Sequence, residues 1–243
     1  MNSNPVALVT GGSRRVGRVI CLALAGAGYD VALTSHGPSD ETDAVAKSIR
    51  DQGYRALVLS ADLTQLPSAV DQINAEFSAN FDRLDLLVHN ASVYHPSGMN
   101  DATVEQMRQM WSVHVEAPLL LCRAFAGRLR EAHGAVINMV DILAQRPRPA
   151  YAGYCASKAA LENLTLSLAR ELAPRVTVNG IAPGVVEWPD DMPESARQAY
   201  LSRVPLGRAG TPEDVARTVI FLARDARYIT GQIIRLDGGR MLA

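Results

Sequence analysis

The chain has 243 residues, 48% of them hydrophobic, and a formal net charge of −1 at pH 7. This length is enough for one sizeable core, and α/β chains of this size are commonly single domains. The near-neutral charge argues against nucleic acid or an anionic membrane as the main partner. No apolar run reaches transmembrane length, and the first residues lack the basic-then-apolar pattern of a signal peptide. We therefore expect a cytoplasmic protein.

The three cysteines, Cys21, Cys122 and Cys155, stand far apart in apolar stretches with helical periodicity. Their spacing fits no metal site, so we expect free or buried thiols in a reducing compartment and no bound metal. Cys155 directly follows Tyr154, and core packing is its expected role.

The first predicted strand, residues 6–10, runs into a loop that contains glycines, and apolar residues then recur at helical spacing up to Gly28. Backbone N–H groups of such a loop, together with a helix N-terminus, hold a pyrophosphate. The strict G-x-G-x-x-G pattern is absent, and the alternative is an ordinary strand–helix turn. We predict a nucleotide site formed by Gly11, Ser13, Arg14, Arg15, Val16 and Gly17.

The second predicted strand, residues 30–34, ends without an acidic residue. An Asp or Glu at this point usually binds the free ribose 2′-hydroxyl of NAD. Ser35 and His36 stand there instead, and the arginines of the first loop add positive charge, which suits a 2′-phosphate. We predict NADPH as the cofactor. In the alternative, His36 is an exposed loop histidine and the arginines alone select the cofactor.

Two further strands, residues 56–60 and 84–89, end in short polar turns. Asp62 and Leu63 follow the first of them and are predicted to meet the adenine, although Asp62 could equally cap the next turn. After the second strand, a turn of small residues is expected to line the ligand crevice, namely Asn90, Ala91 and Ser92.

Aromatic and imidazole side chains follow this turn. Tyr94 offers either a face on which a flat ring can stack or an ordinary half-buried aromatic. The stretch 103–133 is predicted to be mostly helical, with a kink or break near Pro118. His114 stands there among apolar neighbours, so we expect a hydrogen-bonded structural histidine.

The stretch from Val136 to Lys158 carries the candidate chemistry. An apolar strand, residues 136–140, ends in Asp141, and a loop with two prolines leads into a helix that carries Tyr154 and Lys158. Four residues apart, the phenol and the ammonium share one helix face, where the ammonium is expected to favour the ionised phenol. A Tyr-x-x-x-Lys pair also occurs by chance as a surface pair, so the rest of the chain must decide.

The last third continues the alternation of strands and helices, with predicted strands at 176–180 and 232–236. Between them lies an irregular acidic stretch, and residues 185–205 are interpreted as a substrate lid. An exposed Ω-loop or a subunit contact is the alternative. The alternation predicts one Rossmann-type, doubly wound α/β domain over residues 1–243, with a seven-stranded, mostly parallel sheet and helices on both faces.

Five segments occur in the order and spacing of the short-chain dehydrogenase/reductase family, which the chain resembles over almost its whole length. These segments are Thr10–Gly17, Asn90–Ala91, Tyr154–Lys158, Asn179–Gly184 and Gly231–Gly239. The resemblance implies an NADP(H)-dependent oxidoreductase. It also implies a homotetramer with the C-terminal tail near subunit contacts.

Three details narrow the resemblance to the pteridine reductases, the trypanosomatid enzymes and their bacterial relatives. Arg15 replaces a glycine that most members carry, Asp141 stands where most place a catalytic serine, and the lid reads Trp188–Pro193. An ionised Asp141 would repel the oxyanion of a reduced carbonyl, whereas a pterin offers N–H donors and ring nitrogens. His114 departs from the family, because many members have an asparagine there.

The narrower resemblance implies NADPH-dependent reduction of dihydropterins or dihydrofolate at a ring C=N bond. Asp141, Tyr154 and Lys158 would be catalytic, and the pterin would lie between the nicotinamide and Tyr94, with Arg15 and Ser92 at its polar edge. Residues after the sixth strand would complete both sites: Pro183, Gly184 and Val185 at the cofactor, and Gly184, Val185 and Trp188 at the substrate.

Two rival interpretations remain. A generic short-chain carbonyl reductase, such as a 3-oxoacyl-thioester reductase, is allowed by the family motifs and opposed by Asp141. An NADP(H)-binding sensor or scaffold without turnover is opposed by the intact pair of Tyr154 and Lys158.

Overall fold

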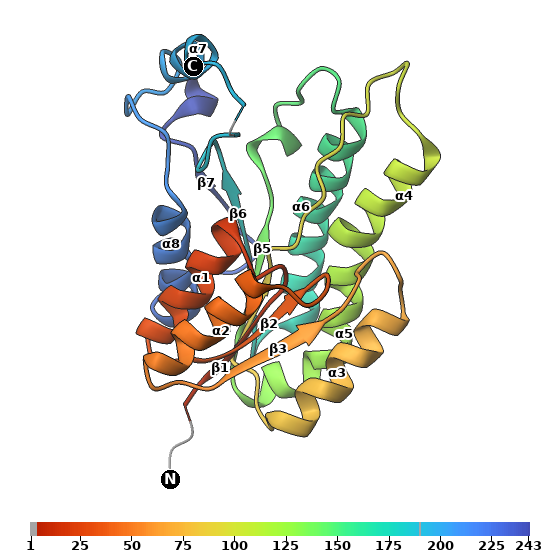
Figure 1. Cartoon of the computed structure of the whole chain (residues 1–243), viewed down its shortest axis with the longest axis vertical. Helices are drawn as coiled ribbons and strands as arrows, with labels where there is room; N and C mark the ends of the chain where they lie inside the picture. Colours follow the sequence, from red (N-terminus) through yellow and green to blue (C-terminus); the bar gives the residue numbers. More distant parts are fainter. Residues whose placement is uncertain (1–3, 190) are drawn as a thin grey trace.

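The computed structural model describes residues 4–189 and 191–243. Asp190, part of the predicted lid, lies outside the described residues. Strands and helices alternate along the described chain and build one sheet covered on both faces (Figure 1).

The sheet has seven strands in the order β3-β2-β1-β4-β5-β6-β7, and every neighbouring pair is parallel. The strands are Val6–Val9 (β1), Asp30–Ser35 (β2), Ala56–Ser60 (β3), Leu86–His89 (β4), Ala135–Met139 (β5), Thr177–Pro183 (β6) and Ile233–Leu236 (β7). The strand order reverses between β1 and β4. In such sheets a ligand crevice opens at the carboxyl ends of the strands at this point. The predicted doubly wound α/β fold is confirmed.

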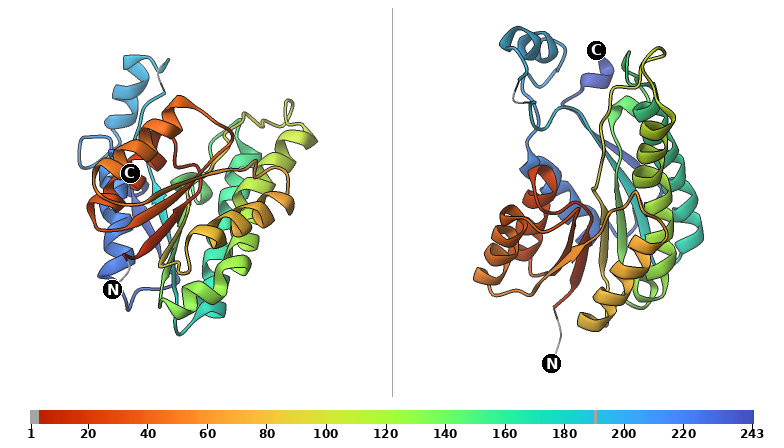
Figure 2. Two further views of the ribbon diagram at one scale, coloured as in Figure 1. Left: turned by 60° about the horizontal axis from the view of Figure 1, so that its bottom comes forward. Right: turned by 45° about the vertical axis from the view of Figure 1, so that its right-hand side comes forward.

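Helices cover the sheet in two layers, with α1, α2 and α8 on one face and α3 to α6 on the other (Figure 1). Their bounds are Arg15–Gly26 (α1), Asp40–Asp51 (α2), Ser68–Asn80 (α3), Val104–Trp111 (α4), Ala117–Glu131 (α5), Ala152–Leu172 (α6), Glu194–Leu201 (α7) and Pro212–Arg224 (α8). Helix α7 belongs to neither layer. It stands beyond the carboxyl ends of the strands, beside the C-terminus (Figure 2).

The central strands are buried on both sides, as a sheet between two helix layers requires. One core cluster fills the layer beneath α3 and α5, where the rings of Phe77 and Phe125 meet at 5.0 Å and 75°. A second cluster packs α1 and α8 against the opposite face, through residues such as Ile20, Leu24 and Val219.

The predicted break near Pro118 has a more specific cause than proline alone. Residues Ser112–Glu116 form a π-helical turn between α4 and α5, and Pro118 sits in the first turn of α5, where no backbone N–H is needed. Helix α2 begins at Asp40, because the Ser39 hydroxyl caps its N-terminus by accepting from the Thr42 N–H.

Among the described residues, no helix combines the length and the apolar composition that crossing a membrane requires. All three cysteines are free and buried, as expected. No cluster of histidine, cysteine or carboxylate side chains in residues 4–189 and 191–243 has the arrangement of a metal site.

Phe125→Ala is expected to lower the free energy of unfolding by about 3–5 kcal/mol, because the fully buried ring leaves a cavity beside Phe77. Urea unfolding measures the loss. Phe221→Ala, at a ring that is 49% exposed, is the matched control and should cost about 1 kcal/mol at most. Equal losses at the two positions would contradict this description of the core.

Candidate active site

The glycine loop after β1 is held in shape by hydrogen bonds from neighbouring strands. The Gly11 N–H donates to Thr34 Oγ1 (3.0 Å), and Asn90 Nδ2 donates to the carbonyl oxygens of Thr10 (3.0 Å) and Gly11 (2.9 Å). Gly11 has a φ of +63°, and a Cβ on Gly17 would come within 2.1 Å of the Gly11 oxygen. The loop therefore needs glycine at both positions to bring its backbone close to a ligand.

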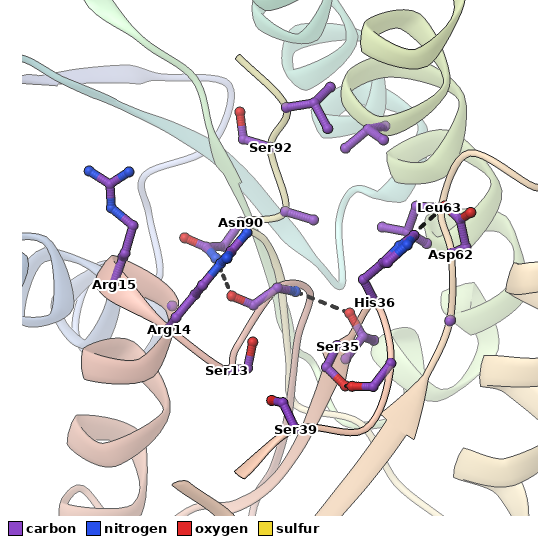
Figure 3. A pocket seen from close by; sticks show the side chains of 18 of the residues that line it. Ser13, Arg14, Arg15, Ser35, His36, Ser39, Asp62, Leu63, Asn90 and Ser92 are labelled. Carbon is purple, nitrogen blue, oxygen red and sulfur yellow. Dashed lines mark hydrogen bonds and ion pairs between the residues drawn. The ribbon is translucent and has the colours of Figure 1, made fainter. Parts of the chain in front are cut away.

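A cavity of about 920 Å³ opens over this loop, at the upper end of the range for ligand sites (Figure 3). Its wall brings together most of the predicted cofactor residues, which come from four different loops. They are Gly11, Ser13, Arg14, Arg15, Val16, Gly17, Ser35, His36, Asp62, Leu63, Asn90, Ala91 and Ser92. The volume, the close-approach glycines and the N-terminus of α1 fit a nicotinamide dinucleotide.

The end of β2 supplies polar groups but no acid. Ser35 donates its hydroxyl hydrogen to the Gly37 oxygen at 2.8 Å, so only its lone pairs remain for a ligand. His36 is largely exposed, with Nδ1 3.6 Å from Asp62 Oδ1. The carboxylate of Asp62 itself accepts the N–H and the hydroxyl of Thr64. Asp62 therefore caps the turn that follows it, which was the alternative role expected for this residue.

Arg15 joins the glycine loop to the predicted lid. Its Nε lies 2.6 Å from Glu187 Oε2, although the two residues are 172 positions apart in sequence. Figure 3 shows the Arg15 side chain on the opposite side of the cavity from His36 and Asp62. Arg15 therefore lies toward the lid, whereas His36 marks the other end of the cavity.

Asp141, Tyr154 and Lys158 meet at the carboxyl end of β5. The Tyr154 hydroxyl donates to Asp141 Oδ2 at 2.8 Å, and Asp141 Oδ1 accepts the Leu143 N–H at 2.8 Å. Lys158 Nζ donates to the Met139 carbonyl at 2.8 Å and lies 5.7 Å from the centroid of the Tyr154 ring. The three predicted catalytic side chains thus form one buried group.

The protonation of this group differs from the sequence-based expectation. Burial raises the pKa of Tyr154 well above its usual value, and the adjacent Asp141 carboxylate raises it further. The prediction that Lys158 favours the ionised phenol is wrong in this geometry. Its ammonium lies toward a backbone carbonyl, whereas the hydroxyl lies toward a carboxylate.

Burial also favours the uncharged forms of Asp141 and Lys158. It raises the pKa of Asp141 above its usual value, against the opposing effects of the Leu143 N–H, the Tyr154 hydroxyl and the Lys158 charge. It lowers the pKa of Lys158 to about 8, although the charge of Asp141 acts in the opposite direction. The site is therefore arranged to keep a proton between Asp141 and Tyr154 rather than to ionise the phenol.

Tyr94 packs against Tyr154. Its ring stacks on Tyr151 with centroids 4.5 Å apart and meets Tyr154 edge-on at 4.6 Å. Arg148 Nη1 donates to its hydroxyl at 3.4 Å. Tyr94 is still 44% exposed, so a face remains on which a flat ligand ring can stack.

His114 ties the loop after β4 to helix α6 and is a structural histidine, as expected. The Val93 N–H donates to its Nε2 at 3.2 Å, so Nε2 is the acceptor and Nδ1 carries the hydrogen. Nδ1 then donates to Ser157 Oγ at 2.8 Å, and Ser157 donates to the Tyr154 carbonyl at 2.7 Å. The Ser92 hydroxyl lies 2.9 Å from Nε2. Burial lowers the pKa of His114 well below its usual value, so the ring stays neutral.

The segment after β6 packs against Tyr200 of α7. The Val185 N–H donates to Tyr200 Oη at 2.9 Å, and Trp188 meets Tyr200 edge-on at 5.5 Å. Pro183, Gly184 and Val185 do not line the cavity over the glycine loop. Their contacts with cofactor and substrate remain predictions.

Several side chains at the site carry no sequence signal. Thr34 looks like an ordinary strand residue, yet its hydroxyl oxygen accepts the Gly11 N–H. Tyr151 and Tyr200 are unremarkable helix-flanking and helical aromatics in sequence. Their contacts with Tyr94 and Val185 depend on tertiary packing alone.

Comparison with known proteins supports the family suggested by these motifs. A family model described as enoyl-(acyl carrier protein) reductase matches residues 11–240. The chain is 35% identical to the 3-oxoacyl-[acyl-carrier-protein] reductase FabG of Staphylococcus aureus over 248 residues, covering 98% of this chain and 99% of that protein. A Synechocystis 3-oxoacyl-[acyl-carrier-protein] reductase is 35% identical over 242 residues, covering 98% and 97%.

The chain belongs to the short-chain dehydrogenase/reductase family. Among solved structures, an acetoin dehydrogenase from Enterobacter cloacae superimposes with a TM-score of 0.90 at 31% identity, covering 100% of this chain and 98% of that one. The short-chain dehydrogenase/reductase fold and oxidoreductase class are thereby shown. The named relatives act on 3-oxoacyl carriers and acetoin, and none of them is named a pteridine reductase.

The neutral His114 of this short-chain reductase predicts a loss of stability in acid. Below about pH 6.5 the unfolded chain gains a proton on this histidine that the folded protein does not accept. The free energy of unfolding should therefore fall as the pH falls, by about 1.4 kcal/mol per pH unit from this group. His114→Gln should reduce the slope measured by urea unfolding, whereas His133→Gln, at an exposed position, should not. An unchanged slope in His114→Gln would contradict the neutral assignment.

The charge of Asp141 supports the protonated form of Lys158, so Asp141→Asn should lower the pKa of Lys158 below about 8. Lys158 is expected to hold the nicotinamide ribose as an ammonium. NADPH affinity should therefore decline with rising pH at a lower pH in the variant than in the wild type. Fluorescence titration of NADPH across the pH range measures this. Asp51→Asn, on exposed α2, is the control, and a midpoint unchanged or raised in Asp141→Asn would refute the coupling.

Proposed function

We propose that this short-chain dehydrogenase/reductase uses NADPH to reduce a dihydropterin or dihydrofolate at a ring C=N bond, giving the tetrahydro form. The observation that carries the proposal is the hydrogen bond from Tyr154 to Asp141 Oδ2. A carboxylate occupies the place where most family members have a serine. This changes which substrate the site can accept.

Asp141 disfavours a carbonyl substrate. Reduction of a ketone places negative charge on its oxygen, and catalysis then depends on hydrogen-bond donors that face this oxygen. Ionised Asp141 only accepts hydrogen bonds and repels that charge, and it also occupies the Tyr154 hydroxyl. A pterin ring instead offers N–H donors, for which a carboxylate is a suitable acceptor.

The chemistry of C=N reduction suits the raised pKa values of Asp141 and Tyr154. The nicotinamide cofactor supplies the hydride, which goes to the ring carbon, and the neighbouring nitrogen needs one proton. Tyr154 and Asp141 share a proton in a buried pair and can pass it to that nitrogen. The pKa of Lys158 is lowered to about 8, so its ammonium can return a proton to the pair more readily than an ordinary lysine.

The residues around the catalytic group support binding of a flat heterocycle. The half-exposed ring of Tyr94 provides a stacking surface directly above Tyr154. Ser92, held by His114, and Arg15 at the lid provide polar contacts for the edge of the ring. We keep Gly184, Val185 and Trp188 as the proposed opposite wall of the substrate pocket.

NADPH is proposed over NADH because the end of β2 has no carboxylate that would bind a free 2′-hydroxyl. His36 is exposed and lines the cavity beside Arg14, so both can approach a 2′-phosphate. Ser35 can contribute only as an acceptor, since its hydrogen is bound to Gly37.

A second candidate is reduction of a 3-oxoacyl thioester. The names of the relatives favour it, since the matches to Staphylococcus aureus and Synechocystis are 3-oxoacyl-[acyl-carrier-protein] reductases. Whole-chain identity near 35% reports mainly the shared scaffold, whereas the residue at position 141 faces the reacting atoms. For that reason the local chemistry decides our order of preference.

We also propose the homotetramer that the family resemblance implies. Trp111, Leu119 and Leu166 on α4, α5 and α6 are each more than 40% exposed in the single chain. Large apolar side chains exposed on helices of one layer support a subunit contact on that face. A single monomer mass in solution would exclude it.

Absorbance at the NADPH band, followed with 7,8-dihydrobiopterin, dihydrofolate and acetoacetyl-CoA, tests the proposal. Fast oxidation with a dihydropterin and slow oxidation with acetoacetyl-CoA is the expected result. The reverse pattern would establish the second candidate and overturn the first. NADPH binding without oxidation of any substrate would instead indicate a binding protein.

Asp141→Ser is expected to lower kcat/KM for the dihydropterin by about a hundredfold, because the shared proton is lost, and to raise turnover of simple ketones. Tyr154→Phe should abolish both reactions. Asp82→Ser, at an exposed carboxylate, is the matched control and should leave both unchanged. A substrate profile that Asp141→Ser does not alter would show that this carboxylate does not select the substrate.

A further inference from the structure

A buried arginine next to the predicted lid has hydrogen-bond donors that the described residues do not use. Arg240 belongs to the short 3₁₀ turn Arg240–Leu242, and its Nε and Nη1 atoms are buried with no hydrogen-bond partner among the described residues. Buried polar groups are normally hydrogen-bonded, and a charged one especially so. Such a guanidinium is therefore set up for a partner that the chain itself does not supply.

The backbone that carries Arg240 is firmly held. Asp237 accepts the Gly239 N–H at 2.9 Å and the Met241 N–H at 2.8 Å, using both carboxylate oxygens. This carboxylate is thus committed to the turn and leaves the guanidinium unpaired. From the loop before α6, Arg146 Nη1 donates to the carbonyl oxygens of Arg240 (3.2 Å) and Ala243 (2.6 Å), which adds positive charge beside the tail.

Arg240 lies against the ring of Tyr200, which also binds the segment after β6. Its guanidinium carbon lies 5.4 Å from the ring centroid of Tyr200, whose hydroxyl binds the Val185 N–H. The charges of Arg240 and Asp141 both act on the pKa of Tyr200, which burial raises above its usual value. Both charges therefore lie within electrostatic range of Tyr200, and α7 and the C-terminus stand together beyond the strand ends (Figure 2).

We infer that Arg240 binds an anionic group on the part of the substrate that extends away from the reacting ring. A ligand held at Asp141 and Tyr154 would direct its tail toward the lid, past the ring of Tyr200. The planar guanidinium offers parallel N–H donors that match a carboxylate or a phosphate. Arg240 is thus a specificity-determining residue, and this assignment rests in part on the proposed function.

Two classes of substrate carry such an anionic group. One is dihydrofolate, whose tail bears carboxylates that dihydrobiopterin lacks. The other is an acyl-CoA or carrier-bound thioester, which bears phosphate groups. Each class has an uncharged counterpart with the same reacting group, namely dihydrobiopterin for the pterin pair and ethyl acetoacetate for the ketone pair.

The test compares selectivity in the wild type and in Arg240→Met, which keeps the length of the side chain and removes its donors. The ratio of kcat/KM for dihydrofolate to that for dihydrobiopterin, or for acetoacetyl-CoA to ethyl acetoacetate, should fall about tenfold or more. The loss should appear mainly in KM, because Arg240 is remote from the reacting atoms. Arg240→Lys should restore part of the ratio.

Arg203→Met is the matched control, since Arg203 is exposed just after α7. Both ratios should stay at the wild-type value in this variant. A purely structural role for Arg240, such as supporting Tyr200, would slow charged and uncharged substrates equally and leave the ratios unchanged. That result would overturn the assignment.

Because two substrate pairs are used, a failure of the anion site can be distinguished from a failure of the proposed function. If only the ketone pair is turned over, the pterin proposal fails, and Arg240 is still tested by the acetoacetyl-CoA ratio. If dihydropterins are reduced but Arg240→Met leaves their ratio unchanged, the proposed function stands and the anion site fails. A fall in the dihydrofolate ratio assigns the anion to carboxylates, and a fall in the acetoacetyl-CoA ratio assigns it to phosphates.

Discussion

The hydrogen bond between the Tyr154 hydroxyl and Asp141 Oδ2, 2.8 Å long, is the interaction on which the chemistry of this site depends. It forms in a buried environment that raises the pKa values of both groups. A tyrosine that faced a serine would be free to donate to a ketone oxygen. Here the same hydroxyl donates to a carboxylate, and the two side chains together hold one proton. The substrate that we propose for this pair is one that gains a proton on nitrogen.

The scaffold around this pair is common to the short-chain dehydrogenase/reductase family, and the differences lie at the ends of its strands. Parallel strands place the glycine loop, Asn90 and Asp141 along one edge of the sheet. The relatives named 3-oxoacyl-[acyl-carrier-protein] reductases share that scaffold along almost their whole length. Similarity over the fold therefore establishes the cofactor chemistry more firmly than the substrate. We propose that substrate choice depends on a few side chains, among them Asp141 and Arg240.

The sequence predicted those parts of the fold and site that short segments determine. Alternating strands and helices indicated the doubly wound sheet, and the spacing of Tyr154 and Lys158 indicated one helix face. Features set by distant contacts were missed. Burial reversed the expected effect on the Tyr154 phenol, and the pairing of Arg15 with Glu187 joins residues 172 positions apart. Neither depends on a local pattern, so only the packed chain reveals them.

The most direct test of the account is the titration of the Asp141 carboxyl group itself. Carbon-13 NMR of protein labelled at the aspartate carboxyl carbon can follow it, and the Asp141 signal is the one that disappears in Asp141→Asn. The account predicts a midpoint above the usual aspartate value of 3.8, because burial outweighs the hydrogen bonds and the Lys158 charge. A midpoint at or below that value would mean that burial does not favour sharing of the Tyr154 proton with Asp141, and the proposed chemistry would be wrong.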